Sequence, residues 1–452
     1  MSPYDGSDNE REVRVMKFTV ERDALAEAVT WAVRTLPVRP VIPVLGGVLL
    51  RAAGDGLTLS CFDYEVSARM RVPAAVAEAG AVLVPGRLLA EITRSLPGLP
   101  VEFADDPDGV SMTCGEVAFT LATLPPEEYP ELPELPLLAG TADGGVLAAA
   151  ISQVTPAASR DDTLPMLTAV SLELGGQTLT LAATDRYRLA VRDLAWSPAD
   201  WIGEHVREAG KAAVLVPART LADAAKMMSP GVPVRIMLRE SGGAGGGAMG
   251  GAADGGGAMI GFEAGVRRLT TRLLAGEFIR YRSRFPEEFG CTADLPAQAF
   301  AEAVRRVSLV AERGTPVQLS FAPGRVTVGA GTQGQARARE NVPANFTGDE
   351  PVIAFSPHYL LDGVLAAALP PMTPVAPAAP AAPAAPADPA DPAGRARAQA
   401  EAPAADGTTQ VRLQFTSASK PAVITQRPPG GAGGREAGTD FRYLVVPQRV
   451  QQ

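Results

Sequence analysis

The sequence has few of the residues on which most enzyme and metal sites depend. Its 452 residues include only the histidines His205 and His358 and the cysteines Cys61, Cys114 and Cys291. The histidines lie in no HExxH or triad-like context, and the cysteines form no CxxC pair or metal-ligand spacing. The glycine-rich stretch near 242–247 lacks the following lysine and helix of a phosphate-binding loop. We therefore expect no catalytic residue, no metal and no cofactor.

Other absences narrow the class of protein. No run of about 18 apolar residues could span a bilayer, and the first residues lack the apolar segment of a signal peptide. Unpaired cysteines are typical of the reducing cytoplasm, where we place the chain. Aromatic residues are only 5%, so the core must consist mainly of Leu, Val, Ala and Ile. The net charge of −9 argues against a surface that is basic everywhere but allows a basic inner face.

What the sequence does have is one pattern of elements, present three times. Each copy opens with an amphipathic helix, at 23–37, 145–159 and 298–314. A strand pair follows, at 43–63, 166–185 and 316–331, with glycine-containing hairpin turns. A strand leading into a second helix comes next, at 81–98, 213–231 and 352–370. Alternating strands close each copy, at 101–124, at 234–238 with 259–274, and at 411–415, 422–426 and 441–447. This order predicts an α+β fold of three similar domains, with helices on one face of antiparallel sheets.

The repeats define the expected domain boundaries. We expect a tail at 1–15 and domains at 16–136, 142–277 and 286–450. The second domain contains a Gly-rich insert at 241–258, and the third a Pro/Ala-rich insert at 371–406 and a Gly-rich insert at 428–438. Such compositions cannot bury a core, and they stand where shorter copies have surface turns.

Five segments, in order along the chain, resemble the bacterial DNA polymerase III beta subunit, the DNA sliding clamp. They are MKFTVERDALAEAV at 16–29, RPVIPVLGGVLL at 39–50, LATLPPEEYPEL at 121–132, ATDRYRLAVRDL at 183–194 and FRYLVVPQRV at 441–450. The resemblance covers about 16–450 outside the inserts. It implies a non-catalytic processivity factor: a head-to-tail homodimer whose six domains form a ring around duplex DNA, each chain supplying half of it.

The resemblance also implies which residues contact DNA. The family's helices line the central hole, where basic side chains attract phosphates without reading sequence. The matching residues are Arg39, Arg34, Arg87, Arg94, Arg219, Lys226, Arg305 and Arg306. The alternative for each is an ordinary solvated surface charge. Acidic residues Glu91, Asp223 and Glu302 lie on the same helices, and we expect them to face away from the hole.

A second implied site is a cleft between domains two and three, where polymerase subunits, the clamp loader and other clamp-binding proteins insert a short peptide. The matching residues are Leu167, Thr184, Arg186, Tyr187, Arg188, Leu189, Ile279, Leu444, Val446, Pro447 and Arg449. Arg188 and Arg449 are expected to fix peptide groups, whereas Leu167 and Leu189 could instead be plain core. Ile279, Arg284 and Val446 depart from the family's usual residues, which predicts an altered peptide preference.

The dimer interface is implied by Phe119 and Leu121, on an edge strand of domain one, facing Ser308 and Leu309 of domain three. The alternative for the first pair is inward packing. Ser308 stands where an apolar residue is usual, which leaves ring stability open. The expected partners are double-stranded DNA, the polymerase III alpha subunit and the clamp loader, in the cytoplasm at the replisome. The alternative function is a divergent paralogue that binds clamp partners without being loaded on DNA.

Overall fold

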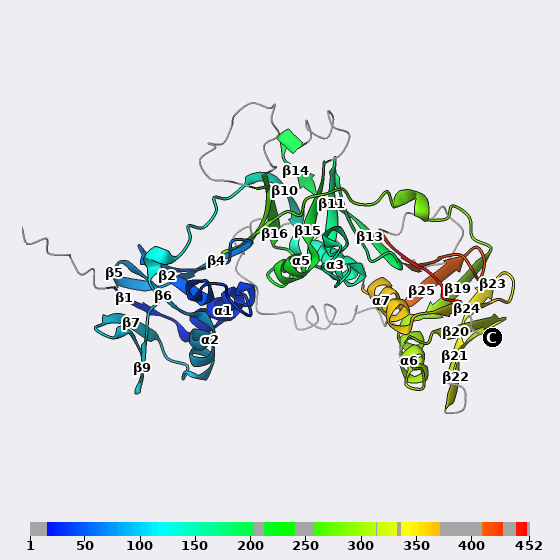
Figure 1. The fold of residues 1–452 in the computed structure, drawn as a ribbon, viewed down its shortest axis with the longest axis horizontal. Coiled ribbons are helices and arrows are strands. Elements are labelled where there is room, and N and C mark those ends of the chain that lie inside the picture. The colour runs from blue at the N-terminus through cyan, green and yellow to red at the C-terminus, as the bar shows by residue number, and fades with distance from the viewer. Residues whose placement is uncertain are drawn as a thin grey trace, which may run out of the picture. The chain divides into compact units, whose positions relative to one another are not determined.

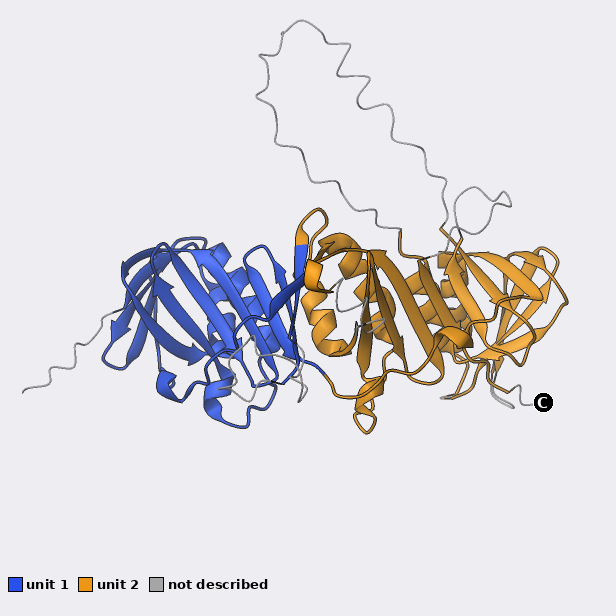
Figure 2. Ribbon diagram, turned by 90° about the horizontal axis from the view of Figure 1, so that it is seen from above, with its two compact units in different colours: residues 1–139, 234–273 blue, residues 140–233, 274–452 orange. Residues whose placement is uncertain are grey.

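The computed structural model describes residues 16–202, 212–239, 257–312, 314–331, 336–370, 409–427 and 440–449. The expected tail at 1–15, the Pro/Ala-rich and second Gly-rich inserts and nearly all of 241–258 lie outside these residues, as does His205. The chain divides into two compact units, shown in different colours in Figure 2. Unit 1 comprises residues 1–139 and 234–273, and unit 2 comprises residues 140–233 and 274–452.

Unit 1 holds the first repeat together with the closing strands of the second. Its helices are α1 (Arg22–Ala32) and α2 (Gly86–Ser95), with 3-10 turns η1 (Val33–Thr35), η2 (Pro43–Gly46) and η3 (Pro126–Glu128). Its strands are β1 (Lys17–Val20), β2 (Gly47–Ala53), β3 (Gly56–Phe62), β4 (Val66–Pro73), β5 (Ala75–Glu78), β6 (Gly80–Pro85), β7 (Val101–Asp106), β8 (Gly109–Cys114), β9 (Val117–Leu121), β16 (Pro233–Arg239), β17 (Met259–Ala264) and β18 (Arg267–Arg272).

Two antiparallel sheets organise unit 1. One has the order β5-β1-β7-β8-β9, and the other runs β16-β17-β18-β4-β3-β2-β6. Helices α1 and α2 pack side by side against the second sheet (Figure 1). Strand β4 shows how the sequence sets this arrangement, because successive side chains alternate between faces. Ala68, Met70 and Val72 are buried, whereas Arg69 and Arg71 are exposed. The second sheet therefore has an apolar face toward the helices and a polar outward face.

Unit 2 contains the rest of the second repeat and the third. Its helices are α3 (Gly144–Val154), α5 (Ala218–Ala225), α6 (Ala297–Ser308) and α7 (Pro357–Ala367), with η4 (Thr155–Ala157), η5 (Pro165–Leu167) and η6 (Arg282–Arg284). Its strands are β10 (Leu137–Asp143), β11 (Ala169–Gly175), β12 (Thr178–Thr184), β13 (Arg188–Ala195), β14 (Ser197–Pro198), β15 (Ala212–Pro217), β19 (Cys291–Pro296), β20 (Val317–Ala322), β21 (Arg325–Gly331), β22 (Arg337–Pro343), β23 (Asn345–Thr347), β24 (Val352–Phe355), β25 (Gln410–Phe415), β26 (Ala422–Gln426) and β27 (Phe441–Val445).

The sheets of unit 2 follow the same plan. The order β15-β11-β12-β13-β27-β26-β25-β19-β23 forms one sheet and β22-β21-β20-β24 another, while β14 pairs with β10. Helices α3 and α5 pack on each other, as do α6 and α7 (Figure 1). The expected helices and hairpins are thus present in all three repeats, and the α+β prediction is confirmed. Strands β4, β13 and β22, which follow each hairpin, carry charged residues and were not singled out from the sequence.

Two repeats match residue by residue. The segment 43–73 aligns with 165–195 without a gap, and the cross-strand pairs correspond along it: Ser60 faces Arg69 in the first copy as Ala182 faces Val191 in the second. Even the backbone strain is repeated, because the non-glycine residues Tyr64 and Arg186, which occupy equivalent positions, have φ of 73° and 81°. Side chains on these strands can therefore be compared at known positions.

The repeats are joined by one pairing rule. Strand β18, the last closing strand of the second repeat, pairs antiparallel with β4 of the first. Strand β27, the last closing strand of the third repeat, pairs in the same way with β13 of the second. Among the described residues, β9 and β22 are left at sheet edges, although they are the corresponding closing and fourth strands. One closing strand, β9, and one fourth strand, β22, therefore each keep a free edge.

Candidate functional site

The residues implied for DNA contact lie on helices α1, α2, α5 and α6 or just after them, and all are exposed. Arg87 and Arg94 are on α2, Arg219 is on α5, and Arg305 and Arg306 are on α6. Arg34 lies in η1, and Lys226 is the residue that ends α5. Exposure on helices is what a phosphate contact requires, but it is equally compatible with a solvated charge.

Two of these cations are held by acidic residues. Arg306 forms a two-point ion pair with Glu340, at 2.6 and 3.0 Å, and a longer one of 3.6 Å with Glu302. Lys226 pairs with Asp223 at 2.6 Å. Three- and four-residue spacing places Asp223 and Glu302 on the same helix face as the cations with which they pair. The expectation that these carboxylates face away from the hole stays a prediction. These two cations are weaker candidates for phosphate contact than the others.

Arg39 lies in an exposed loop between η1 and η2. The prolines at 37 and 40 restrict this loop, and Arg87 donates a hydrogen bond of 3.2 Å to the carbonyl oxygen of Pro37. One candidate contact on α2 therefore anchors the loop that carries another. The neighbouring Val41 is 96% exposed, so the loop stands out from the surface. This placement suits a side chain that contacts the phosphate backbone of DNA.

The implied peptide cleft is built around a small apolar cluster in unit 2. Ala182, Leu189, Val191, Tyr281 and Leu444 form its buried part, and Phe278, Phe285 and Val446 pack against it. Leu189 lies opposite Leu444 where β13 pairs with β27. Leu167 in η5 is 6% exposed and Leu189 is 3% exposed, so both are core in the single chain, as the alternative interpretation allowed.

Exposed apolar surface remains around this cluster. Ile279 is 40% exposed and Tyr187 is 58% exposed, and the backbone amide of Val446 donates to the carbonyl oxygen of Tyr187 at 2.9 Å. Pro447 is half-buried and Arg449 is exposed just beyond β27. The structure thus brings residues from three separate segments together at one surface, which sequence spacing alone could not establish.

The turn that precedes β13 is fixed by its own side chains. The Thr184 hydroxyl donates to the carbonyl oxygen of Arg188 at 2.6 Å and accepts from the amide of Arg186 at 3.1 Å. Asp185 accepts from the amides of Tyr187 and Arg188 at 3.0 and 3.1 Å. These bonds hold Arg186 at positive φ and leave its side chain and that of Tyr187 exposed.

Arg188 was expected to bind peptide groups, but the chain itself uses its guanidinium. The side chain is 9% exposed and forms ion pairs with Asp185, at 3.0 Å, and with Asp362 of α7. It also lies 4.5 Å from the centre of the Tyr359 ring and within hydrogen-bond distance of the Tyr443 hydroxyl. Burial opposes its charge, but Tyr443, Asp362 and Asp185 outweigh burial and raise the pKa of Arg188. In this structure Arg188 therefore joins β13 to α7 and β27.

Two of the implied interface residues lie on the edge strand β9, and the other two lie at the end of α6, which packs against β22. Phe119 and Leu121 are on β9: Phe119 is half-buried, whereas Leu121 is 3% exposed and packs inward. Ser308 ends α6, and its hydroxyl donates to the carbonyl oxygen of Val304 at 2.5 Å. Leu309 is 84% exposed, which is unusual for a leucine. Phe119 and Leu309 thus offer apolar surface, and Ser308 satisfies its own hydroxyl.

Sequence reasoning missed two groups of polar residues. Asp362 and Tyr359 of α7 complete the surroundings of Arg188, but they lie far from it in sequence and carry no motif. Four arginines of unit 1, Arg51, Arg69, Arg71 and Arg268, line one cavity. Their signal was the alternation of Arg69 and Arg71 with apolar residues, which places them on one face of a strand.

The described residues show neither a metal site nor a membrane span. Among them, His, Cys, Asp and Glu nowhere gather in a group of three or more that could hold a metal ion. No helix in the described part of the chain is both long and apolar enough to cross a bilayer.

Comparison with known proteins identifies the family of the chain. Models of the DNA polymerase III beta subunit match it in order: the N-terminal domain over residues 16–133, the central domain over 142–279 and the C-terminal domain over 282–370. A beta sliding clamp of Streptomyces coelicolor is 44% identical, covering 96% of this chain and 100% of the relative. A beta sliding clamp homolog, GriR, of Streptomyces muensis is 43% identical over 77% of this chain and 88% of its own length.

Solved structures agree on the fold. The sliding clamp of Bacillus subtilis superposes with a TM-score of 0.74 at 24% identity, covering 96% of this chain and all of that one. A Pseudomonas aeruginosa clamp bound to griselimycin gives a TM-score of 0.75 at 23% identity, with the same coverage. With three family models in order and a close relative along nearly the whole length, the chain belongs to the DNA polymerase III beta subunit family, the bacterial beta sliding clamps.

Proposed function

We propose that this protein is a DNA sliding clamp, a non-catalytic cytoplasmic subunit. Two copies of it form a closed ring around duplex DNA. The ring tethers the replicative polymerase and presents a peptide-binding cleft to it, to the clamp loader and to other partners. Each chain contributes three domains, at 16–136, 142–277 and 286–450. The observation that carries the proposal is that β9 and β22 each have one free edge, whereas the corresponding strands of the other repeats pair with each other.

The pairing of closing strands with fourth strands predicts which strand of a second copy would pair with β9. Leu269 on β18 lies opposite Ala68, and Tyr443 on β27 lies opposite Ala190. In each repeat an isolated β-bridge follows the last closing strand, and it involves Leu124, Leu274 and Gln448 in turn. Leu269 and Tyr443 lie five residues before their bridge, and Phe119 on β9 lies five residues before Leu124. Phe119 is therefore the equivalent residue of the first repeat. Leu269 and Tyr443 are buried by their neighbours, whereas Phe119 is only half-buried. The half-exposed Phe119 supports a partner strand beside β9.

The partner position on β22 follows in the same way. Ala68 faces Cys61, Ala190 faces Ala183 and Ala338 faces Ala330. The second residue of each pair holds an equivalent position, because it lies five residues after the first strand residue that follows a two-residue hairpin turn, which is Gly56, Thr178 and Arg325 in turn. Phe119 of one copy should therefore lie opposite Ala338 of the other. Unpaired strand edges favour addition of another strand, and head-to-tail contacts close into a ring when the rotation allows it.

A cross-linking experiment tests this register. The double variant Phe119→Cys, Ala338→Cys should form a disulfide-linked dimer under mild oxidation, because the two thiols would face each other across the proposed strand pair. The native cysteines are buried and should not compete. A control with Phe119→Cys and Asn341→Cys moves one thiol three residues, about 10 Å, along β22. That distance exceeds what a disulfide spans, so the control should remain monomeric on a denaturing gel. Equal cross-linking of both pairs would contradict the proposed register.

DNA contact is supported by the six exposed arginines of the set that form no ion pair with a described residue. They lie on α1's 3-10 extension, the 37–42 loop, α2, α5 and α6: Arg34, Arg39, Arg87, Arg94, Arg219 and Arg305. Attraction to phosphates from such residues is independent of sequence and falls steeply with salt, which allows sliding. Arg39 is the first choice among them because it stands on an exposed loop.

Peptide binding is supported by the apolar cluster and its exposed margin. Ile279 and Tyr187 can bury apolar peptide side chains, while Arg449 remains available to a carboxylate. Arg188 acts by holding the floor of the site rather than by contacting the peptide. We propose Ile279→Asp as the variant that separates recruitment from ring formation, since it places a charge on exposed apolar surface and leaves the free edges unchanged.

Primer extension with the cognate polymerase and clamp loader tests the function as a whole. Longer products should appear only when this protein is added, and the Phe119→Asp variant should lose the effect because it cannot close the ring. The Ile279→Asp variant should lose it while still forming dimers. Unchanged product length with the wild-type protein would overturn the proposal.

The second candidate function is that of a clamp paralogue that binds partners without being loaded. It is favoured by the near-equal identity to a beta sliding clamp and to the clamp homolog GriR, 44% and 43%. Ser308 at the edge of domain three fits a weaker ring. A monomeric mass by light scattering at micromolar concentration, together with no gain in product length, would favour this function.

A further inference from the structure

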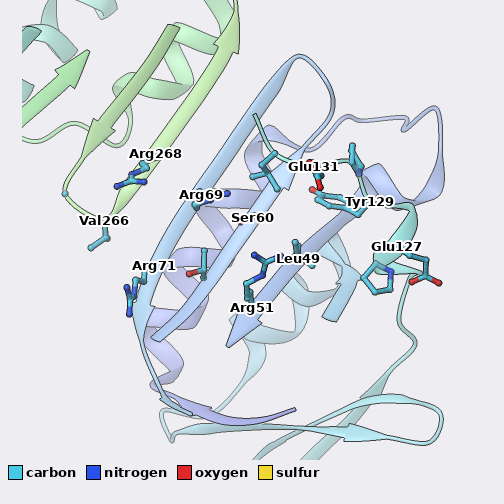
Figure 3. Close-up of a pocket in the computed structure, with 15 residues that line it drawn as sticks. Leu49, Arg51, Ser60, Arg69, Arg71, Glu127, Tyr129, Glu131, Val266 and Arg268 are labelled. Carbon is cyan, nitrogen blue, oxygen red and sulfur yellow. The ribbon is translucent and has the colours of Figure 1, made fainter. Parts of the chain in front are cut away.

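A cavity of about 840 Å³ lies on the outward face of the second sheet of unit 1, away from α1 and α2 (Figure 3). Its floor is the outward side of β2, β3, β4 and β18. The cross-strand register places Arg268 beside Arg69 and Ser60 in one row, and Arg71 beside Thr58 and Arg51 in the next. The volume is within the range of small-ligand and short-peptide sites.

The positive charge in this cavity is only partly neutralised. Arg71 pairs with Asp55 and Arg268 with Glu263, each at 2.5 Å. Among the described residues, Arg51 and Arg69 form no ion pair with a carboxylate. Burial, Arg268 and Arg51 together lower the pKa of Arg69, as expected when like charges are crowded. An anionic group placed between Arg51 and Arg69 would relieve this repulsion.

The walls of the cavity limit the charge that it can accept. Glu127 and Glu131 stand at its margin, where they would repel a polyanion (Figure 3). Leu49, Leu132 and Val266 add apolar surface, and Val266 is 57% exposed. A strand of nucleic acid makes no use of aliphatic walls and would be opposed by the two carboxylates. The lining suits a ligand with one or a few carboxylates and apolar side chains.

The second repeat shows what occupies the equivalent face. There Glu173 stands in the place of Arg51 and Asp193 in the place of Arg71. Glu173 pairs with Arg282 at 2.5 Å. Tyr281, in the same segment, lies in one buried apolar cluster with Val191, which takes the place of Arg69. The acidic version of this face is therefore covered by a segment of the chain that is basic and aromatic, residues 278–285.

We propose that the basic version of the face, in unit 1, binds an acidic peptide with apolar or aromatic side chains, supplied by a partner protein. The charges are inverted relative to the second repeat, so the occupant should carry inverted charges too. Carboxylates of the peptide would contact Arg51 and Arg69, with Thr58 and Ser60 as additional hydrogen-bond donors. Its apolar side chains would lie against Leu49, Leu132 and Val266. This site is separate from the cleft built around Leu189 and Leu444.

The probe for the test comes from the chain itself. A fluorescein-labelled peptide with the sequence of 278–285 and the changes R280E, R282E and R284E should bind the full-length protein, as measured by fluorescence anisotropy. The matched peptide with the three native arginines should bind at least tenfold more weakly. Binding of the acidic probe should weaken as salt rises, since exposed charges are screened.

Variants locate the binding. Arg51→Glu together with Arg69→Glu should weaken the acidic probe at least tenfold and should now favour the arginine-containing probe. Arg325→Glu, which changes an exposed arginine of β21, should leave both affinities unchanged. The milder Arg69→Gln variant, checked by circular dichroism, should weaken the acidic probe in the same direction. The exchange of preference is a result that a general loss of folding cannot produce.

Three outcomes would overturn the proposal. They are equal binding of the two probes, an acidic-probe affinity that the double variant leaves unchanged, and displacement of the probe by tripolyphosphate or single-stranded DNA at lower concentration than by unlabelled peptide. The last outcome would assign the cavity to phosphate ligands instead.

Discussion

The segments 43–73 and 165–195 have the same strand pairing and an apolar inward face each, but their outward faces differ. Leu50, Leu59 and Ala68 correspond to Leu172, Leu181 and Ala190, and all six are buried. On the outward face, by contrast, an exposed Arg69 corresponds to Val191, which is fully buried in one cluster with Tyr281. The inward, apolar side of these strands determines the fold. Their outward side can differ, and it is either covered by another segment of the chain or left exposed as a possible binding site.

The largest expected effect comes from exchanging residues between the two faces. Val191→Arg would bury a charge beneath Tyr281 without a partner, and we expect a loss of about 3–5 kcal/mol in the free energy of unfolding. The reciprocal Arg69→Val changes an exposed position and should alter that free energy by no more than about 0.5 kcal/mol. Urea denaturation of both variants measures the difference. Similar losses would show that the first face is covered as well.

A smaller but still large effect is expected at Arg188, whose equivalent in the first repeat is Val66. Arg188→Met removes the charge that pairs with Asp185 and Asp362 and leaves the 11%-exposed Asp185 without it. We expect a loss of about 3 kcal/mol. Val66→Ala removes only part of a half-buried side chain and should cost about 1 kcal/mol. Urea denaturation checks this pair too, and a neutral Arg188→Met would contradict the role given to this ion-pair cluster.

The smallest effect concerns His358, which belongs to the same cluster. Burial and Arg188 lower the pKa of His358 from its ordinary 6.5, against the opposing influence of Asp362 and Asp185. The unfolded chain then binds a proton at a higher pH than the folded chain does. Stability should consequently be constant above about pH 6.5 and should fall as the pH drops below it. His358→Gln should flatten this part of the stability profile, and an unchanged slope would assign it to other groups.

Much of the fold could be predicted from the sequence because its signals are local. Helix α1 was expected at 23–37 and is Arg22–Ala32 with a 3-10 extension to Thr35, and the glycines of the hairpin turns have positive φ, as at Gly54 and Gly176. The strand after each hairpin was missed because charged residues interrupt its apolar pattern, as Arg69 and Arg71 do in β4 and Arg188 and Arg192 do in β13. The pairing of β18 with β4 joins residues about 200 apart and leaves no periodic trace in either strand.

The candidate site could be predicted only where local pattern and family resemblance coincide. Exposed arginines on helices follow from helical spacing, and all eight implied cations are exposed. The internal use of Arg188 could not be foreseen, because Asp362 reaches it from α7. The cavity of unit 1 was missed for a related reason: its arginines come from three strands that are adjacent only in the folded sheet.

The central claim is that the protein holds DNA by topology, with two copies joined through β9 and β22. The most direct measurement is retention on DNA after loading by the cognate clamp loader, followed by gel filtration at high salt. The account predicts that the protein stays with a nicked circular plasmid and is released when the plasmid is cut once. Equal retention on circular and linear DNA, or release from both, would contradict it.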